Sequence, residues 1–552
     1  MAIENNCPNR TLIDYKDTNY FSKIAVDYVE GAAALKPFYS HPANKAGIEA
    51  AMKARSNFSK DTRQVLQDNM RKHYENTPSP LTHFDLVRDN IASLTSENTF
   101  TITTAHQPNI FGGPLYLVYK ILHVIQIAEA LNEQYADKHF VPVYYMGSED
   151  ADLEEIGQMQ VDGKRYVWQT DQTGPVGRML VDKKLISLID ELEGQIGVGV
   201  HGPAFIDLLR ESYKEGCLIQ EATFTFIHQL FGKYGLLILM PDDQALKEVF
   251  EPIVIKELKE GFSHQAVEQS SAAIAAAGYK VQTHGRPINL FYQEGNSRKR
   301  IITEGEDFKI EGEEKLKSAA EIIQEVKQRA DLFSGNVVLR GPFQETVLPN
   351  IAFVGGGGEL AYWLEMKGVY EAAQVPYPVL LLRNSFMLMR PKEWTVLQKL
   401  GLSAVDLFKP LHEIQDLLLA KSGDQVDMVF ELEALKQLYE NMREKAAAVD
   451  PTLSGHTDAI SKQALNKAAR LVTKMKSANR KKIEIQTGQL QFLKDRLFPG
   501  ASLQERTENI AGFYADYGDK IFDLIKKDSE ALTQQFGVLY LPEADKHPKA
   551  GY

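Results

Sequence analysis

The stretch TFTITTAHQPNIFGGPLYLVYK, residues 99–120, and the later stretch FVPVYYMGSEDAD, residues 140–152, decide the fold of this chain. Residues 100–105 form a β-branched run and residues 140–146 an apolar one, which is typical of buried parallel strands. Between them, apolar residues recur at helical spacing over 115–131. Strand, helix and strand together predict a βαβ unit of an α/β fold. Both strands of such a unit end at one edge of the sheet, where open α/β sheets usually bind ligands.

Hydrogen-bond donors gather in the loop after the first predicted strand. His106, Gln107 and Asn109 lie just before the predicted helix, whose N-terminus carries partial positive charge. Gly112 and Gly113 would let the backbone approach a ligand closely. One interpretation is a site that donates hydrogen bonds to a phosphate or a developing oxyanion. The other is a capped helix start with a tight turn, but the crowding of these residue types favours the first.

An acidic turn follows the second predicted strand. Ser148, Glu149, Asp150 and Asp152 could hold Mg²⁺, accept hydrogen bonds from a ribose or an ammonium group, or act as a base. Charged loops after strands are commonly just solvated, but this one should lie at the same sheet edge as His106, which favours a function. For the similar turn at 241–243 we favour the solvated loop.

Four consecutive glycines, Gly355, Gly356, Gly357 and Gly358, precede Glu359 and the start of a predicted helix. The run matches neither a dinucleotide-binding fingerprint nor a Walker A loop, because no Gly-Lys-Ser/Thr follows. Four glycines in a row cost backbone entropy on folding, which argues against an unconstrained surface loop. We therefore expect a backbone nest for an anion here.

Further candidate residues flank the glycine run. We predict a strand over 336–340 and a loop over 341–346, which would place Glu345 beside the glycines. Tyr362 lies on the helix predicted after the glycines, where its ring could pack in the core or form a stacking wall. Arg383 directly follows a further apolar strand. Together these residues predict a second wall for the ligand site.

The totals limit the class of protein. At 552 residues the chain is too long for one ordinary domain. The net charge of -12 argues against a surface that grips nucleic acid throughout. Cys7 and Cys217, the only cysteines, indicate neither a disulfide framework nor a Cys-rich zinc site. With no signal-peptide pattern and no apolar stretch of about 18 residues, we expect a soluble cytoplasmic protein without a membrane partner.

The chain divides into five predicted segments. They are N-terminal helices with the first half of an α/β core (1–155), a further core strand with an inserted subdomain (156–335), the second half of the core (336–390), a helical coiled coil (391–500) and a helical tail that packs on the core (501–552). Within the second segment, an Asp-Gly pair predicts a tight hairpin.

The coiled coil is predicted from an apolar seam with alternating spacings of three and four residues. The seam residues are Leu432, Leu435, Tyr439, Met442, Ala446 and Val449. A second helix over about 456–497 follows a break at 451–455, so the two helices should pack antiparallel. The second helix is strongly basic, through Lys462, Lys467, Arg470, Lys474, Lys476, Arg480, Lys481 and Lys482. We interpret this as a solvated face or as pairing with glutamates of the first helix, with nucleotide or nucleic-acid binding as the alternatives.

Four motifs resemble the bacillithiol-synthesis cysteine ligase family, BshC. They are AHQPNIFGGPLY at 105–116, FVPVYYMGSEDAD at 140–152, LPNIAFVGGGGELAYW at 348–363 and LFPGASLQER at 497–506. With shorter matches near the N-terminus, the similarity spans nearly the whole chain. The family usually has Gln at the position of His106, and Gly-Gly-Pro-Gly where this chain has four glycines.

The resemblance implies a Rossmann-like nucleotidyltransferase core of class I synthetase type, with inserted connecting-peptide subdomains and an antiparallel coiled coil that forms a homodimer. It also implies a reaction that joins the carboxyl group of cysteine to the amine of glucosaminyl-malate. Because amide formation from a free carboxylate is uphill in water, we expect activation by ATP as an acyl-adenylate, with Mg²⁺ as a potential cofactor and no zinc.

The expected roles follow from this chemistry. His106, Gln107 and Asn109 would stabilise the α-phosphoryl transition state, and Asp150 or its acidic neighbours would bind the amino group, the ribose or Mg²⁺. Two other functions stay open at this point. One is a catalytically degenerate nucleotide-binding scaffold that presents a coiled coil, and the other is an RNA-binding synthetase relative, which the net charge disfavours.

Overall fold

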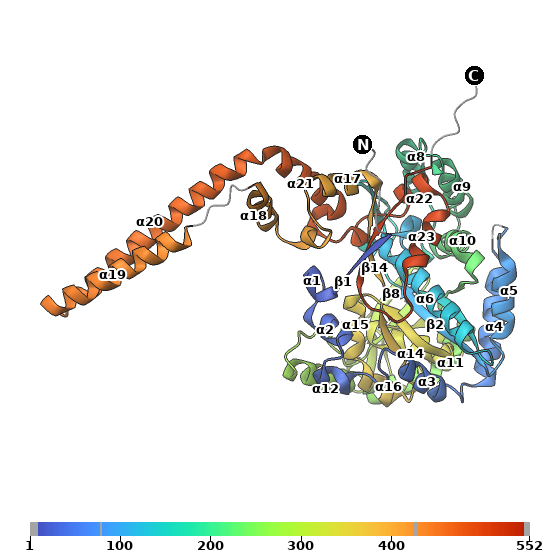
Figure 1. Ribbon diagram of the computed structural model, residues 1–552. Helices are drawn as coiled ribbons and strands as arrows, with labels where there is room; N and C mark the ends of the chain where they lie inside the picture. The colour runs from blue at the N-terminus through green and yellow to red at the C-terminus, as the bar shows by residue number, and fades with distance from the viewer. Residues whose placement is uncertain (1–8, 78–79, 423–427, 546–552) are drawn as a thin grey trace, which may run out of the picture. The chain divides into compact units, whose positions relative to one another are not determined.

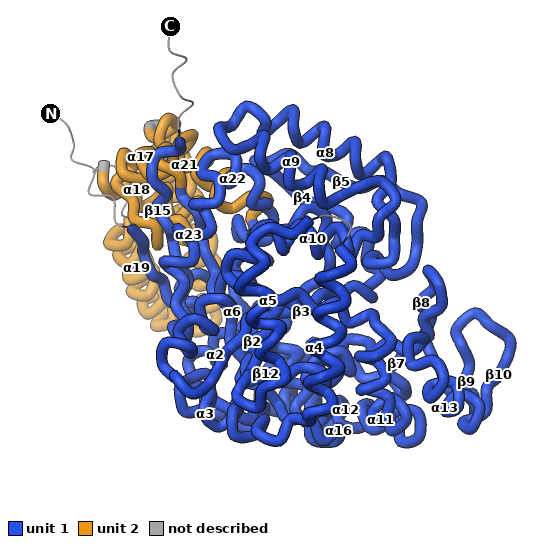
Figure 2. Tube along the Cα trace, turned by 90° about the vertical axis from the view of Figure 1, so that its right-hand side faces the viewer, with its two compact units in different colours: residues 1–389, 502–552 blue, residues 390–501 orange. Residues whose placement is uncertain are grey.

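The computed structural model describes residues 9–77, 80–422 and 428–545, so Cys7 and the N-terminal residues searched for a signal peptide lie outside the description. The chain forms two compact units, coloured separately in Figure 2. The core unit comprises residues 1–389 and 502–552, and the helical unit comprises residues 390–501. No helix among the described residues is both long and apolar enough to cross a membrane.

A five-stranded parallel sheet forms the centre of the core unit, in the order β13-β12-β2-β3-β6. Its strands are β2 (Thr99–His106), β3 (His139–Met146), β6 (Leu237–Leu239), β12 (Asn350–Gly355) and β13 (Val379–Leu382). Taken in chain order, β2 is the first strand and β12 the fourth, and the two are neighbours. The strand order therefore reverses between β2 and β12, as in the doubly wound Rossmann fold. The prediction of a Rossmann-like core is confirmed.

The register of the sheet brings the ends of its strands together. His106 pairs with Met146, Val354 with Thr104, and Gly355 with Leu382. The carboxyl ends of four strands thus share one edge, as the βαβ pattern predicted. Helix α6 (Leu115–Gln134) connects β2 to β3 and packs on β2, β3 and β12.

Helices surround this sheet (Figure 1). The N-terminal ones are α1 (Tyr15–Thr18), α2 (Lys23–Val29), α3 (Lys45–Ala54), α4 (Lys60–Glu75) and α5 (Phe84–Ser93), which confirms the mainly helical pattern predicted before the first core strand. Helix α3 packs on β12 and β13, and α5 on β6. Between β3 and β6 come α7 (Leu153–Ile156), the hairpin β4–β5 (Gln158–Val161 and Lys164–Val167), α8 (Lys183–Ile196), α9 (Gly202–Ser212) and α10 (Ile219–Phe231). The hairpin turns at Asp162-Gly163, as predicted.

A second, antiparallel sheet follows helices α11 (Gln244–Glu260) and α12 (Phe262–Ala276). Its order is β10-β9-β8-β7-β11, and its strands are β7 (Leu290–Glu294), β8 (Ser297–Glu304), β9 (Asp307–Ile310), β10 (Leu316–Lys317) and β11 (Phe333–Gly335). The helix α13 (Ala319–Gln328) lies between β10 and β11 in the chain.

The strand predicted at 336–340 and the loop predicted at 341–346 are wrong. Helix α14 (Val337–Val347) spans both. The Asn336 side chain accepts a hydrogen bond from the Val338 amide at 2.9 Å, so it caps a helix that the short apolar run concealed. The helix predicted after the glycine run is instead two helices, α15 (Gly357–Leu364) and α16 (Lys367–Ala373).

The C-terminal tail returns to the core unit and is not wholly helical as predicted. It contains α22 (Ala511–Tyr517), α23 (Lys520–Asp528) and the strand β15 (Phe536–Tyr540). The strand β15 lies between β1 (Arg10–Ile13) and β14 (Ser385–Met389) in a three-stranded sheet. Apolar residues of FGVLY, buried except for Tyr540, form this strand because they fit its pairing partners on both sides.

The helical unit contains α17 (Pro391–Lys399), α18 (Leu411–Ser422), α19 (Val429–Val449), α20 (Leu453–Lys482) and α21 (Glu484–Leu497). Helices α19 and α20 lie side by side as a hairpin (Figure 1), which confirms the antiparallel coiled coil. The second predicted helix is interrupted at Ile483. The basic side chains described on α20 are exposed, except for half-buried Lys476, whereas those of Arg480 and Lys482 lie outside the description. Dimerisation through this unit stays a prediction.

Candidate active site

A cavity of about 450 Å³ lies at the point where the strand order of the central sheet reverses. The residues that line it come from the ends of β2, β12 and β13, from helices α6, α7, α14 and α15, and from the C-terminal tail: His106, Gln107, Tyr116, Lys120, Glu155, Arg340, Gly356, Gly357, Gly358, Glu359, Tyr362, Arg383 and Arg506. The structure therefore brings together eight residues predicted from sequence, namely His106, Gln107, Gly356, Gly357, Gly358, Glu359, Tyr362 and Arg383.

His106 is the last residue of β2 and is held neutral. Its Nε2 lies 3.2 Å from the hydroxyl of Tyr116 on α6, and the two rings meet edge to face. Burial, followed by the positive charges of Lys120, Arg340 and Arg383, lowers the pKa of His106 well below its ordinary value. At neutral pH the imidazole is therefore an uncharged hydrogen-bonding group, able to orient a ligand without adding charge.

Lys120 is a candidate residue that our reading of the sequence missed. It lies on α6 with 2 % of its surface exposed, donates a hydrogen bond to the Ala105 carbonyl at 2.9 Å, and forms an ion pair with Glu359. Burial lowers the pKa of Lys120, Glu359 raises it, and Arg383 and Arg340 lower it further, so the net direction is downward. The sequence signal was a single lysine inside an otherwise apolar helical run, because such a charge needs a polar surrounding.

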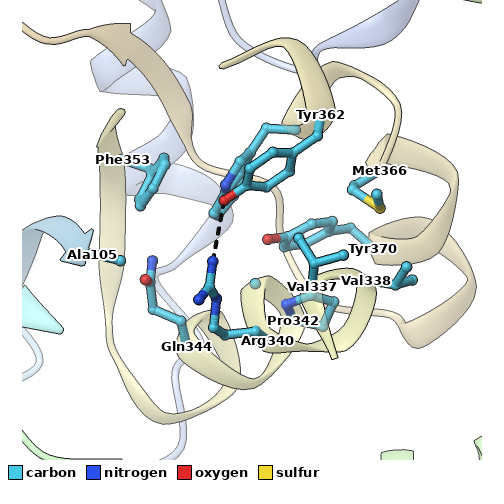
Figure 3. Close-up of a pocket in the computed structure, with 12 residues that line it drawn as sticks. Ala105, Val337, Val338, Arg340, Pro342, Gln344, Phe353, Tyr362, Met366 and Tyr370 are labelled. Atoms are coloured by element: carbon cyan, nitrogen blue, oxygen red, sulfur yellow. Dashed lines mark hydrogen bonds between the residues drawn. The ribbon is translucent and has the colours of Figure 1, made fainter. Parts of the chain in front are cut away.

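Two arginines extend the positive wall of the cavity. Arg340 on α14 donates to Asp150 at 3.0 Å and to the Tyr362 hydroxyl at 3.4 Å, a pair that Figure 3 shows facing each other. Arg383, which follows β13, forms a buried two-pronged ion pair with Glu505 at 2.7 and 2.8 Å. Fixed donors of this kind can bind an anion without first being reorganised.

The glycine run ends β12 and opens α15. Gly355 is the last residue of the strand, and the other three glycines line the cavity. The Gly356 amide already donates to the Glu359 carboxylate at 2.8 Å, so only part of the predicted anion nest faces the cavity. Glu359 therefore links the helix start to Lys120.

The first glycine pair does not form part of this cavity. Gly112 and Gly113 have positive φ angles of 82° and 60°, which a tight turn requires. Asn509 of the tail donates to the Gly113 carbonyl at 2.6 Å, and the first amide of α6, that of Leu115, donates to the Glu508 carbonyl at 2.8 Å. The predicted anion site at this helix start is thus occupied by the protein's own carbonyl group. Asn109 lines a neighbouring cavity instead.

The charged side chains of the acidic turn after β3 bind other residues of the protein. Glu149 pairs with Lys247 at 2.7 Å, and Asp150 accepts from Arg340 at 3.0 Å. The Asp152 side chain accepts from the Glu155 amide at 3.3 Å and so caps the short helix α7. Ser148 is buried, with 1 % of its surface exposed. None of the four lines the cavity, although Asp150 reaches it through Arg340.

Glu345 and the turn at 241–243 also have structural partners. Glu345 is fully buried on α14, where it pairs with Arg55 at 2.5 Å and accepts from the Asn350 side chain at 2.7 Å. Asn350 begins β12, so Glu345 lies at the opposite end of that strand from the glycines. Asp242 is not solvated as expected, because its side chain, 5 % exposed, pairs with Arg178 and Lys247.

The described residues contain no group of three or more His, Cys, Asp or Glu side chains arranged to hold a metal ion. The charged side chains that line the cavity are mostly cations, Lys120, Arg340, Arg383 and Arg506 against Glu155 and Glu359, although Asp150 and Glu505 pair with Arg340 and Arg383 from behind the lining. With His106 neutral, this lining favours an anionic ligand.

Comparisons with known proteins agree with this architecture. A protein of Flavobacterium johnsoniae named "Putative cysteine ligase BshC" is 34% identical over 529 residues, which cover 96% of this chain and 99% of the relative. A protein of the same name from Christiangramia forsetii is also 34% identical, over 96% of this chain and 98% of the relative. A solved structure titled as a putative arginyl tRNA synthetase from Campylobacter jejuni is 12% identical, over 82% of this chain and 100% of its own. Its TM-score of 0.21 is too low to support a structural conclusion.

Two family descriptions match almost the whole chain. Residues 9–384 match "Bacillithiol biosynthesis BshC, N-terminal Rossmann-like domain". Residues 386–541 match "Bacillithiol biosynthesis BshC, C-terminal coiled-coil domain". The chain belongs to the BshC family of bacillithiol biosynthesis.

Proposed function

We propose that the protein is a cysteine ligase, which joins the carboxyl group of cysteine to the amine of glucosaminyl-malate and so completes bacillithiol. Family membership and the names of the relatives support the ligase. The observation that carries the proposal is the cationic cavity at the reversal point of the sheet, which suits the anions of an activated carboxylate.

The first step is activation of cysteine. A carboxylate oxygen attacks the α-phosphorus of ATP, the bond from that phosphorus to the pyrophosphate breaks, and an acyl-adenylate forms. Negative charge spreads over the phosphoryl oxygens in the transition state, so positioned cations lower its energy. Lys120, Arg340 and Arg383 take this role, while His106 donates or accepts a hydrogen bond without adding charge. Any Mg²⁺ would arrive on the nucleotide phosphates.

The second step is transfer to the amine. The amine nitrogen of glucosaminyl-malate attacks the activated carbonyl carbon, the carbon–oxygen bond to AMP breaks, and the amide forms. Residues that bind AMP and the reacting carbonyl group on one side must leave the other side open. The exposed side chains of Arg506 and Glu155 border the cavity and mark the side at which the acceptor enters.

The experiment follows each half of the reaction. Isotope exchange between pyrophosphate and ATP that depends on cysteine is the expected result for the first step, and mass spectrometry of the thiol product tests the whole. Product formation without exchange would refute the adenylate but leave the ligase. Nucleotide binding with no product from cysteine and glucosaminyl-malate would refute the ligase and favour a nucleotide-binding scaffold.

A further inference from the structure

A second cavity of about 310 Å³ adjoins the first, a size within the lower part of the range for small-molecule sites. Three residues, Tyr116, Glu155 and Arg506, line both cavities. The rest of the second lining comes from the turn before α6, from the β4–β5 hairpin and from the tail: Asn109, Pro114, Gln158, Met159, Gln160, Arg165 and Thr507. The three shared residues form a boundary between two chambers.

The frame of the second cavity is held by one buried carboxylate. Glu508, 7 % exposed, accepts from the Gln160 side chain at 2.9 Å and from the Asp162 amide at 2.7 Å, while its carbonyl accepts from the Leu115 amide at 2.8 Å. Hairpin, tail and α6 are therefore fixed to one another. A chamber framed in this way keeps its shape before a ligand arrives, which limits the entropy lost on binding.

The lining of this cavity differs from that of the first. Amide and hydroxyl side chains predominate, and these groups hydrogen-bond readily to sugar hydroxyls. Arg165 and Arg506 are exposed and form no ion pair with another described residue. Guanidinium groups left without a partner suit a ligand that carries carboxylates, which they can bind with two hydrogen bonds each.

Asn109 provides a second, independent indication of a ligand. Only 2 % of this residue is exposed, and its Oδ1 is buried without a hydrogen-bond partner among the described residues. A buried acceptor without a donor costs free energy, so such an atom needs an explanation. A hydroxyl group of a ligand in the cavity that Asn109 lines would supply the donor.

Glu155 lies at the boundary and is exposed to both chambers. Partial burial, followed by the nearby carboxylates of Asp152 and Asp150, raises the pKa of Glu155. The other charged or titratable groups of this boundary are Arg506 and Tyr116, whose pKa burial raises. A carboxylate with a raised pKa is a better base than an ordinary surface glutamate.

We propose that the second cavity is the acceptor subsite, which binds an aminosugar carrying a dicarboxylate, and that Glu155 takes a proton from its amine. The inference rests on the proposed function. Arg165 and Arg506 bind the carboxylates, and Asn109 and its polar neighbours bind the sugar hydroxyls. The amine then lies at the boundary beside Glu155, facing the activated carbonyl group in the first cavity.

The proton inventory balances. An ammonium group gives one proton to the Glu155 carboxylate and becomes a neutral amine. Its nitrogen lone pair forms the bond to the carbonyl carbon, and the electron pair of the breaking carbon–oxygen bond leaves with AMP. The second proton on the new amide nitrogen passes to water, and the protonated Glu155 returns its own proton to solvent before the next turnover.

Arg165→Gln tests the subsite. The expected result is a rise of about tenfold or more in the KM for glucosaminyl-malate, with the KM for cysteine and the cysteine-dependent exchange unchanged, because a charge-assisted contact to the acceptor alone is lost. Lys164→Gln is the matched control, since Lys164 also carries a charge on β5 but lines neither cavity. An unchanged KM for glucosaminyl-malate, or an equal rise in the KM for cysteine, would overturn the assignment.

Glu155→Gln tests the base. The expected result is a fall in kcat for amide formation of about 100-fold, with the acidic limb of its pH profile lost and the exchange reaction retained. Glu154→Gln, which alters an adjacent exposed residue that lines neither cavity, should behave like the unaltered protein. A retained acidic limb, or an equal loss of exchange, would contradict the role of Glu155.

Direct binding separates this inference from the proposed function. Calorimetric titration with glucosaminyl-malate alone should show binding by the unaltered protein and by Lys164→Gln, and weaker binding by Arg165→Gln. If the protein formed no amide but kept this pattern, the ligase would be refuted and the subsite would stand. If it formed the amide while Arg165→Gln bound as tightly as the control, the subsite would be refuted and the ligase would stand.

Discussion

Lys120 and Lys247 are both buried at the same edge of the central sheet, 2 % and 4 % exposed, yet their surroundings are opposite. Burial lowers the pKa of each. At Lys247 the carboxylates of Glu149 and Asp242 more than offset this effect, so its pKa is raised. At Lys120 the single carboxylate of Glu359 does not offset the effect of burial, because Arg383 and Arg340 also lower the pKa.

The difference separates a structural charge cluster from a site. Around Lys247, the two carboxylates meet two cations, because Arg178 also contacts Asp242 at 2.6 and 2.8 Å. Charges there are mutually satisfied. Around Lys120, Arg340 and Arg383 pair with Asp150 and Glu505 behind the lining, whereas cations outnumber carboxylates among the side chains that line the cavity. A buried cation with a lowered pKa beside a cavity indicates that the missing negative charge comes from a ligand.

The largest effect on stability should come from Lys247→Met. Loss of the ammonium group leaves Glu149 and Asp242 with less compensation in a buried setting, and breaking such a cluster costs about 3–5 kcal/mol. Urea unfolding measures this free energy. Lys259→Met, at an exposed position near the end of the same helix, should change it by no more than about 0.5 kcal/mol. A loss below about 1 kcal/mol for Lys247→Met would mean that the cluster is not structural.

Lys120→Met should show the reverse pattern, with a large loss of activity and a smaller loss of stability. Removal of a positioned cation from the phosphoryl site should lower the rate of cysteine-dependent exchange about 10²–10³-fold. The methionine can remain buried where the charge was disfavoured, so the free energy of unfolding should fall less than in Lys247→Met. Exchange within threefold of the unaltered rate would remove Lys120 from the site.

The pH dependence of the free energy of unfolding reports how strongly burial and the neighbouring cations disfavour a protonated His106. The pKa of His106 is lower in the folded protein than in the unfolded chain, so below about pH 6.5 the unfolded chain binds more protons and stability falls as the pH falls. Between pH 7 and pH 5 this one residue should cost up to about 2 kcal/mol, the limit set by its titration in the unfolded chain. In His106→Gln the fall over the same interval should be smaller by that amount, measured by urea unfolding at each pH. Equal falls in both proteins would contradict a neutral, half-buried His106.

The sequence predicted the candidate site where parallel strands end together, because that juxtaposition follows from local pattern alone. His106 ends one strand, Gly356 and Arg383 directly follow two others, and all three line one cavity for this reason. Long-range pairing was invisible to the same reasoning. Nothing local in the acidic turn shows that Lys247, about a hundred residues later, neutralises Glu149.

Arg340 shows a second limit of sequence reasoning. A short apolar run ending at this residue fits a strand as well as a helix, and only the Asn336 cap separates the two. The misassigned element hid a cation that contacts the turn after β3. Arg506 was missed for another reason. It reaches the cavity from the C-terminal tail, which the sequence pattern predicts to be helical without indicating that it contributes to a site.

The smallest of these effects should come from Asp150→Asn, which tests how the acidic turn acts on the cavity. Asp150 contacts the site through Arg340, whose guanidinium it holds at 3.0 Å, and acts on Glu155 through its charge, so it is a positioning residue. Asparagine keeps an acceptor for Arg340 and removes the charge, so the rate of cysteine-dependent exchange should fall about tenfold, the size of one weakened charge-assisted contact. The KM for glucosaminyl-malate should not change, and Glu154→Gln should leave both quantities unaltered. A loss as large as that of Lys120→Met would instead mean that the Asp150 carboxylate itself contacts a substrate, as the sequence pattern first suggested.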